Sequence, residues 1–261
     1  MSDRGGLLVV TAHPDDEVLI AGGTLTACAW AGLPTAVVCL TRGEQGPICD
    51  PGRATRATLG EVRADELHSA CAVLGVQWVR CYRRQDGNLP WSNRSAIIAQ
   101  LTNVLNARLP DAVVTFGEDG LYYHPDHIAT YEFTLRAVER AAEPPALYRS
   151  VWPDDVMEEL VDELSRRELP TDLWDLEPGE FGVDGEDRVG ELVLDVRPHA
   201  LRKLAALRCH RTQLGPEHAF AALPEDLAVR FLGIERFVPV DPSRDSGWLM
   251  SAVVGKTAAR V

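Results

Sequence analysis

The sequence lacks any long apolar run, and it is short of positive charge. No stretch of its 261 residues approaches the roughly 20 apolar residues in succession that cross a membrane. Lysine and arginine together number 26 against 39 aspartates and glutamates, which gives a net charge of −13. Nucleic-acid binding needs clustered cations. We therefore expect no nucleic-acid partner, no membrane partner or signal peptide, and a cytoplasmic protein that acts on a small molecule.

Lysine is almost absent, and cysteine forms no metal-binding or disulfide pattern. Only Lys203 and Lys256 are lysines, so 26 − 2 = 24 residues are arginine, a bias typical of a GC-rich bacterial genome. The six cysteines include no CxxC pair, and most lie in apolar stretches. We interpret them as buried free thiols.

The first half of the chain alternates between strand and helix patterns. Short apolar runs, typical of strands buried on both faces, are separated by longer amphipathic segments. This rhythm predicts a Rossmann-like α/β fold with a mostly parallel, doubly wound sheet, in which ligands bind beyond the carboxyl ends of the strands. The predicted strands are 7–12, 35–41, 76–82 and 111–117, and the predicted helices are 17–32, 59–75, 92–109 and one that begins at Pro125.

The second half is less regular. The pattern predicts a helix over 154–167, a strand over 191–196 and a helix over 198–212. The acidic stretch 169–190, rich in glycine and proline, is interpreted as loops over the site or at a contact in a homo-oligomer. No boundary divides the chain, so we expect a single domain, 1–261, with a variable acidic region at 150–190 near the site.

Imidazoles and carboxylates follow two of the predicted strands. The first loop reads His-Pro-Asp-Asp-Glu at 13–17, and a later one reads Tyr-Tyr-His-Pro-Asp-His at 122–127. Catalytic zinc takes three nitrogen or oxygen ligands and leaves one position for water. His13, Asp16 and His127 fit that rule and are the predicted ligands of Zn²⁺, with Fe²⁺ or another divalent metal left open.

The remaining polar residues of these loops have roles beside a metal. Asp15 is the candidate general base. Pro125 disfavours helical backbone at His124, so His124 stays in the loop and is free to polarise or protonate the substrate. Asp126 is the candidate acidic partner that orients His124. Taken singly, either motif is also explained as a helix cap or a turn, but two such motifs after buried strands favour a site.

The motifs HPDDE, TRGEQG and HPDH together resemble the LmbE-like or PIG-L-like metal-dependent de-N-acetylases. The resemblance covers the first half of the chain well and the C-terminal part thinly. It implies a Rossmann-like fold and a zinc site with His13, Asp16 and His127 as ligands and Asp15 as base. It also implies hydrolysis of an N-acyl amide, typically on a glucosamine unit.

The resemblance also suggests residues that hold the substrate. Arg63 matches an arginine that holds a substrate hydroxyl or phosphate, although a surface pair with Glu66 is an equal alternative. Asp86 matches a sugar-hydroxyl acceptor or simply forms a turn. Tyr122 matches a tyrosine that assists the oxyanion or else packs at the loop base, and Glu44 either approaches the site or is solvated. No role is assigned to His210.

The sequence leaves two interpretations of the substrate open. Val18 replaces a serine frequent in members that act in mycothiol metabolism, so we favour an N-acetylated aminosugar on an antibiotic-like metabolite, with mycothiol-type thiol-conjugate metabolism as the alternative. Three other classes are disfavoured. A nucleotide-binding protein needs glycines after the first strand, a non-heme iron oxygenase usually has a β-rich fold, and a metal-stabilised binding module would leave Asp15 and His124 idle.

Overall fold

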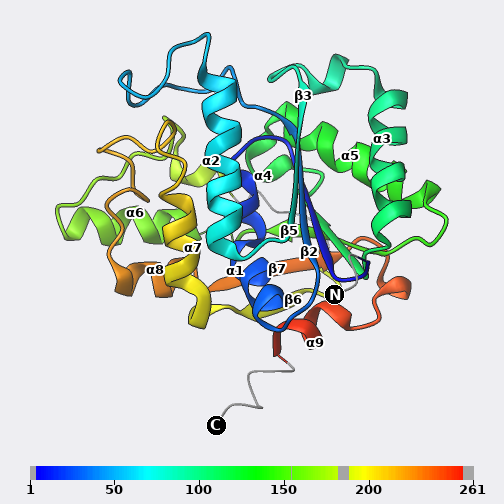
Figure 1. The fold of residues 1–261 in the computed structure, drawn as a ribbon. Helices are drawn as coiled ribbons and strands as arrows, with labels where there is room; N and C mark the ends of the chain where they lie inside the picture. Colours follow the sequence, from blue (N-terminus) through cyan, green and yellow to red (C-terminus); the bar gives the residue numbers. More distant parts are fainter. Residues whose placement is uncertain (1–3, 154, 182–187, 255–261) are drawn as a thin grey trace.

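The computed structural model describes residues 4–153, 155–181 and 188–254. In this part of the chain one seven-stranded sheet runs in the order β3-β2-β1-β4-β5-β7-β6 (Figure 1). The strands are β1 (Leu7–Thr11), β2 (Thr35–Thr41), β3 (Trp78–Arg84), β4 (Ala112–Thr115), β5 (Ala146–Val151), β6 (Leu192–Asp195) and β7 (Ile234–Pro239). The pairs from β3 to β5 are parallel, while β7 runs antiparallel to both of its neighbours. The predicted mostly parallel α/β fold is confirmed.

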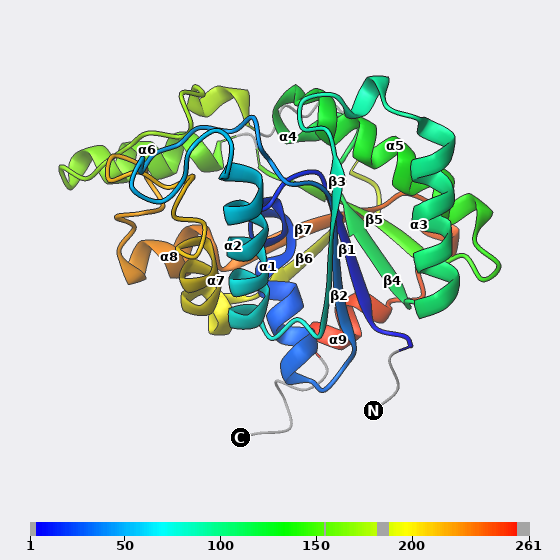
Figure 2. The ribbon, with the colours of Figure 1, turned by 45° about the horizontal axis from the view of Figure 1, so that its top comes forward.

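Helices cover both faces of the sheet. In Figures 1 and 2, α1, α2 and α7 lie on one face, and α3 and α5 lie on the other. β1, β2 and β4 are buried along their whole length because they lie between these two layers. The helices are α1 (Asp16–Trp30), α2 (Leu59–Leu74), α3 (Arg94–Arg108), α4 (Gly120–Tyr123), α5 (Pro125–Arg140), α6 (Val156–Arg166), α7 (Ala200–Leu207), α8 (Glu225–Phe231) and α9 (Trp248–Val254).

The strand order creates a switch point beside β1. The chain passes from β1 outward to β2 and β3, and then crosses back to place β4 on the other side of β1. The loops that follow β1 and β4 therefore leave the sheet side by side, at the edge where ligands bind in folds of this kind. This edge carries α4 and lies at the top of Figure 2.

Helix α1 is broken near its middle, and a buried ion pair fills the break. Ala21 has non-helical backbone angles, φ −152° and ψ 17°. The Glu235 carboxylate accepts hydrogen bonds from the backbone N–H groups of Gly23 and Thr24, at 2.8 Å each. Lys203 Nζ donates to Glu235 Oε1 at 2.7 Å and to the carbonyl of Leu19 at 3.2 Å. The pair thus satisfies backbone groups that the break leaves without helical partners.

The C-terminal half departs most from the predicted elements. β5, β7, α8 and α9 have no counterpart in the sequence prediction, and the helix predicted to reach residue 212 ends at Leu207. Residue 154, where a helix was predicted to begin, and residues 182–187 of the acidic stretch lie outside the described residues. The homo-oligomer stays a prediction.

The cysteines are unpaired, in agreement with their interpretation as free thiols. Cys28, Cys39 and Cys71 are buried, whereas Cys49 is exposed. Across the described ranges, no helix is both long enough and apolar enough to cross a membrane.

Candidate active site

The loop between β1 and α1 is buried and is held by its own side chains. Asp16 Oδ2 accepts a hydrogen bond from the backbone N–H of His13 at 2.7 Å. Asp15 has φ 112°, in a region that L-residues rarely adopt, and its backbone N–H donates to Glu17 Oε2 at 2.9 Å. Strain of this kind persists only where the surroundings hold it, which is a common feature of functional sites.

The segment that precedes α5, which includes the short helix α4, is strained as well. Leu121 and Tyr123 have φ values of 68° and 57°. Pro125 begins α5, and His124 before it is extended, as predicted. His124 Nδ1 accepts a hydrogen bond from the backbone N–H of Asp126 at 3.2 Å. The His124 ring therefore caps α5 and leaves its Nε2 as the nitrogen that can carry the proton of the neutral ring.

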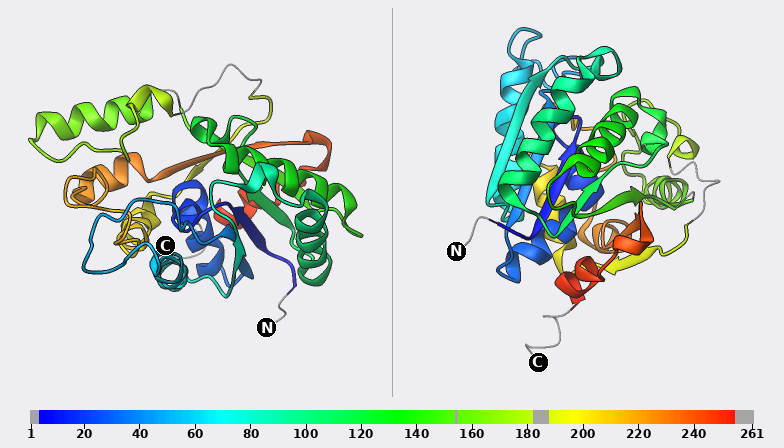
Figure 3. Two further views of the ribbon diagram at one scale, coloured as in Figure 1. Left: turned by 90° about the horizontal axis from the view of Figure 1, so that it is seen from above. Right: turned by 90° about the vertical axis from the view of Figure 1, so that its right-hand side faces the viewer.

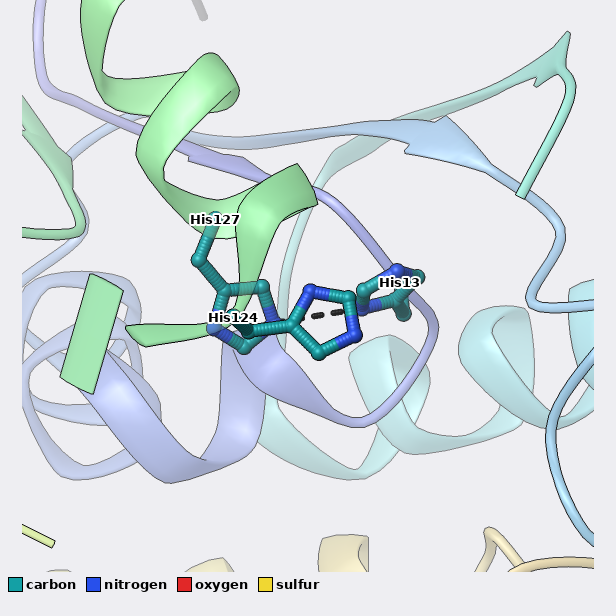
Figure 4. Close-up of side chains that lie close together, drawn as sticks. All are labelled: His13, His124 and His127. Atoms are coloured by element: carbon teal, nitrogen blue, oxygen red, sulfur yellow. Dashed lines mark hydrogen bonds between the residues drawn. The ribbon is translucent and has the colours of Figure 1, made fainter. Parts of the chain in front are cut away.

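The two loops bring three potential metal ligands together. His13 Nδ1 lies 3.2 Å from His127 Nε2 and 3.4 Å from Asp16 Oδ2, and His127 Nε2 lies 3.3 Å from Asp16 Oδ1. Donors placed tetrahedrally at about 2.0–2.1 Å from a zinc ion are about 3.3–3.4 Å apart, and each of these three contacts is close to that separation, with Asp16 turning a different oxygen to each histidine. Figure 4 shows the three histidines of the two loops converging, with His124 beside the other two.

The other ring nitrogens of the two candidate ligands are also engaged. His127 Nδ1 lies 3.0 Å from the carbonyl oxygen of Gly120. His13 Nε2 lies 3.1 Å from Asp86 Oδ1 and 3.4 Å from Asp126 Oδ2. Metal-binding histidines are usually held in this way, because a carbonyl or carboxylate on one nitrogen fixes the proton there and leaves the other nitrogen free.

The position of Asp126 corrects one expectation. Its carboxylate accepts hydrogen bonds from the backbone N–H groups of Gly87 and Leu89, at 2.8 and 3.0 Å, and lies against His13. The orientation of His124, which we expected from this carboxylate, comes instead from the backbone N–H of Asp126. The difference arises because the Asp126 carboxylate is held by the backbone of the loop after β3.

The histidines lie among an excess of buried negative charge. Burial lowers the pKa of His13, but hydrogen bonds with Asp126, Asp16 and Asp86 raise it well above its ordinary value. Burial raises the pKa of Asp16, but His127 and His13 hold it well below its ordinary value. These surroundings favour a cation. The carboxylates that create them belong to Asp15, Asp16, Asp86 and Asp126.

Asp15 is fixed through its side chain by Arg63. Arg63 Nη2 donates to Asp15 Oδ2 at 2.9 Å and to the carbonyl of Pro14 at 2.6 Å, and Nη1 donates to the carbonyl of Gly43 at 2.8 Å. Burial raises the pKa of Asp15 to about 6, although the charge of Arg63 lowers it. A partly buried carboxylate with a raised pKa is typical of a group that exchanges protons.

The alternative surface pair of Arg63 is not formed. Arg63 is only 4% exposed, and Glu66 accepts hydrogen bonds from the backbone N–H and the hydroxyl of Thr212, at 2.9 and 2.6 Å. Arg63 instead borders the pocket above Asp15.

Glu17 and His210 form a buried pair that the sequence analysis did not assign. Glu17 Oε1 lies 3.0 Å from His210 Nε2, while Oε2 accepts the backbone N–H of Asp15. Both side chains are at most 1% exposed. Glu17 belongs to the first motif, which is a signal that could have identified it, but its partner lies 193 positions further along the chain.

A pocket of about 260 Å³ opens over these residues, and its two sides differ in polarity. One side is polar and comes from the loops after β2 and β3, from α2 and from the segment after α7: Gln45, Arg63, Asp86 and Gln213. The other side is apolar and mostly aromatic: Leu19, Leu121, Tyr122, Trp152, Trp174 and Phe181. The pocket can therefore hold a molecule with one hydroxyl-rich and one apolar end.

The remaining predicted residues lie at different distances from the pocket. Asp86 lines it, with Oδ2 accepting the backbone N–H of Gln45 at 2.8 Å. Glu44 lies behind Asp86 and accepts its backbone N–H at 3.0 Å. Tyr122 lines the pocket with its ring 5.2 Å from that of His127, and burial raises its pKa well above the ordinary value. Tyr122 therefore stays protonated.

The N-terminal half carries a family signature, and the similarity to curated relatives extends further. Residues 8–138 match the family described as PIG-L: GlcNAc-PI de-N-acetylase. The 1D-myo-inositol 2-acetamido-2-deoxy-α-D-glucopyranoside deacetylases of Thermobispora bispora and Actinosynnema mirum are 32% and 35% identical to this chain. The alignments cover 91% and 89% of this chain and 88% and 90% of those proteins.

Solved structures share the fold. The 4-carboxy-2-hydroxymuconate hydratase GalB from Pseudomonas putida superposes with a TM-score of 0.64 at 22% identity, over 92% of this chain and 97% of that one. At this identity the likeness concerns the fold alone. The match of the family over residues 8–138, and the identity to relatives along nearly the whole chain, carry the assignment. The chain belongs to the GlcNAc-PI de-N-acetylase (PIG-L) family and is an N-deacetylase.

Proposed function

We infer that the protein hydrolyses the acetamide of an N-acetylglucosaminyl inositol, giving a free amine and acetate. The structural observation that supports this most is the set of contacts of 3.2–3.4 Å among the side chains of His13, Asp16 and His127, beside the Asp15 carboxylate. The named activity of relatives 32–35% identical along nearly the whole chain supports the choice of substrate. Their names favour the thiol-metabolism alternative over the antibiotic-like metabolite that the sequence analysis preferred.

His13, Asp16 and His127 would hold the metal, and zinc suits two imidazoles and one carboxylate. When bound, a divalent metal polarises the amide carbonyl and makes water a stronger nucleophile near neutral pH. The ring nitrogens that would hold the metal are Nδ1 of His13 and Nε2 of His127, because the other two are held by Asp86, Asp126 and Gly120. These contacts hold both rings in a fixed orientation, and a bound metal ion would replace a proton on the nitrogen that is left.

Asp15 accepts the proton of the attacking water in this proposal. Its carboxylate borders the pocket beside the ligand set, and Arg63 and Glu17 hold its side chain and backbone. As water attacks the carbonyl carbon, Asp15 takes one proton. When the carbon–nitrogen bond breaks, the protonated Asp15 returns that proton to the departing amine, which is a poor leaving group without it.

His124 and Tyr122 stabilise the developing oxyanion. Burial, together with nearby His127 and His13, lowers the pKa of His124 to about 4, so its ring is neutral at pH 7. Nδ1 accepts the backbone N–H of Asp126, so the ring proton lies on Nε2. That N–H and the Tyr122 hydroxyl are hydrogen-bond donors available to a negative oxygen.

Arg63, Asp86 and Gln213 form the polar side of the pocket and would hold sugar hydroxyls. Trp174 and Phe181 come from the acidic stretch 169–190, one interpretation of which was loops over the site, and their place in the pocket supports a single catalytic domain over 1–261.

The test is amide hydrolysis by metal-defined protein. Chelator-stripped and zinc- or Fe²⁺-reloaded protein would be assayed for acetate and free amine on N-acetylglucosaminyl inositol, on N-acetylated antibiotic aglycones and on thiol conjugates. We expect equal amounts of the two products from the first substrate, only in reloaded protein, and loss of both bound metal and activity in His13→Ala, Asp16→Ala and His127→Ala. Well-metallated protein that releases no carboxylic acid, or that consumes oxygen instead, would contradict the proposal.

A further inference from the structure

A second cavity adjoins the catalytic pocket. Its volume is about 300 Å³, and it shares two lining residues, Leu19 and Trp152, with the pocket over the histidines. It lies between α1, α6, α8 and the ends of β5 and β7 that face the same edge of the sheet. Figure 3 (left) looks down on this edge and shows α6 (yellow-green) and α8 (orange) on the same side as α1 (blue).

The described walls of this cavity offer apolar surface and charges that are already paired. Arg230 contacts Glu159 at 3.1 Å, and Arg236 contacts Glu191 at 3.2 Å. The Lys203–Glu235 pair at the break of α1 is buried and is bonded to backbone groups. The rest of the lining is mostly apolar and includes Ile20, Val156, Met157, Phe231, Leu232 and Ile234. An apolar guest is therefore favoured, because a charged one would find its possible partners occupied.

The polarity of the catalytic pocket shows which end of a substrate points this way. The polar side contains Arg63, Asp86 and Gln213, and suits the sugar. The opposite side is aromatic, with the Phe181 ring 5.9 Å from Trp152 and nearly parallel to it. Leu19 and Trp152 border both hollows, so the apolar side of the pocket and the second cavity share these two side chains. An amide whose sugar lies on the polar side has its acyl carbon chain on the apolar side.

We propose that the second cavity receives the N-acyl chain, so that the protein hydrolyses amides with acyl groups longer than acetyl in addition to the N-acetyl substrate. The proposal rests on the proposed amide hydrolysis and names the acyl side of its substrate. The reaction is balanced as before: water adds to the carbonyl carbon, the carbon–nitrogen bond breaks, and the fatty acid and the free amine are released. A cavity of this size is within the range of small-ligand sites.

A chain-length series tests the proposal. Zinc-loaded protein would be given glucosaminyl inositol carrying N-acetyl, N-butanoyl, N-hexanoyl or N-octanoyl groups. Each buried methylene should raise kcat/KM about fourfold until the cavity is full. Val156→Phe, at a half-buried position, and Ile234→Phe, at an exposed one, would each narrow the cavity. Both variants should remove the rise of kcat/KM with chain length while leaving N-acetyl hydrolysis unchanged. Leu201→Phe, at an exposed position on α7 that does not line the cavity, is the matched control.

A binding measurement separates the cavity from catalysis. Octanoate should raise the Tm of metal-free protein more than acetate does, and Val156→Phe should abolish that difference while keeping the Tm of the free protein. Two outcomes would overturn the cavity proposal and leave the deacetylase proposal intact. In one, the N-acetyl substrate is hydrolysed but kcat/KM falls as the acyl chain grows. In the other, the dependence of kcat/KM on chain length is the same in both narrowed variants as in the wild type. No product from any member of the series would overturn both.

Discussion

The catalytic pocket and the second cavity lie at the same edge of the sheet, and both contain buried charged residues, but these residues have different partners. In the catalytic pocket, the charged groups of His13, Asp15 and Asp16 converge on a small volume and face the substrate. In the neighbouring cavity, the charges of Lys203 and Glu235 line the wall but are satisfied by each other and by the backbone. The difference shows that burial of charge by itself does not identify a reactive site. What distinguishes the catalytic pocket is an excess of carboxylates that invites a cation.

Removal of the Asp15 charge is the strongest test of the difference between the two hollows. Asp15→Asn should lower kcat by about 10²–10⁴-fold, because a positioned base contributes that much, while bound zinc per chain stays near that of the wild type. Metal analysis and steady-state kinetics on the same preparation provide the measurement. A variant with full rate would assign the base to another residue, and one that loses its metal would make Asp15 a ligand.

On the cavity side, the corresponding change is Lys203→Met. It removes one member of a buried pair and leaves the Glu235 charge uncompensated, which should lower the free energy of unfolding by about 3–5 kcal/mol. Denaturant unfolding measures the loss. Arg136→Ala, which breaks the exposed pair with Glu139, is the control and should leave stability unchanged. Equal stability of Lys203→Met and wild type would mean that the break in α1 does not depend on the ion pair.

Behind the apolar side of the pocket, the burial of His218 should make the free energy of unfolding depend on pH. Its ring lies 4.2 Å from that of Trp174, and burial lowers its pKa to about 4 from an ordinary value of 6.5. The unfolded chain therefore binds the proton first as the pH falls. The stability that His218 contributes is complete above pH 6.5 and is lost between pH 6.5 and 4, by about 3 kcal/mol in total.

Unfolding curves of wild type and His218→Gln between pH 4 and 7 would show this loss as a difference in slope. His68→Gln, at an exposed position on α2, should follow the wild type. Parallel curves for wild type and His218→Gln would refute the assignment.

The smallest expected effect is on kcat, from a substitution of Glu17 behind the catalytic pocket. Glu17 is buried like Glu235 and also binds a backbone N–H, but that N–H belongs to Asp15. Glu17→Gln should lower kcat by about 10–100-fold, with little change in KM or metal content, because partners behind a site orient the residues in front of it. His210→Gln should act in the same direction, since His210 contacts the other oxygen of Glu17. A matching fall in thermal stability with unchanged kcat would make the pair merely structural.

Much of the N-terminal fold could be predicted because its signals are local. β1, β2 and β4 are short apolar runs buried on both faces, and each stands out from the polar segments around it. β5 and β7 lie in the same sheet but contain Arg149 and Arg236, so their patterns resemble neither a buried nor an alternating strand. Their place depends on pairing with each other, which is antiparallel and spans almost 90 positions of the chain.

The site shows the same limit. His13, Asp16 and His127 could be proposed because each follows a predicted strand at the same sheet edge. The position of Asp126 against His13 could not be predicted, since it depends on the path of the loop after β3. The contact of Glu17 with His210 likewise joins two ends of the chain that no short motif connects.

The φ of 112° at Asp15 has a consequence for how such a chain can be improved. Glycine adopts this backbone conformation without steric penalty, so Asp15→Gly would relieve strain at that position, although it would also remove the ion pair with Arg63. A selection for thermal tolerance alone would favour glycine at position 15, because glycine relieves the backbone strain, and would thereby remove the proposed general base. Directed evolution of this scaffold therefore needs a turnover screen in every round, because stability and activity make opposite demands on residue 15.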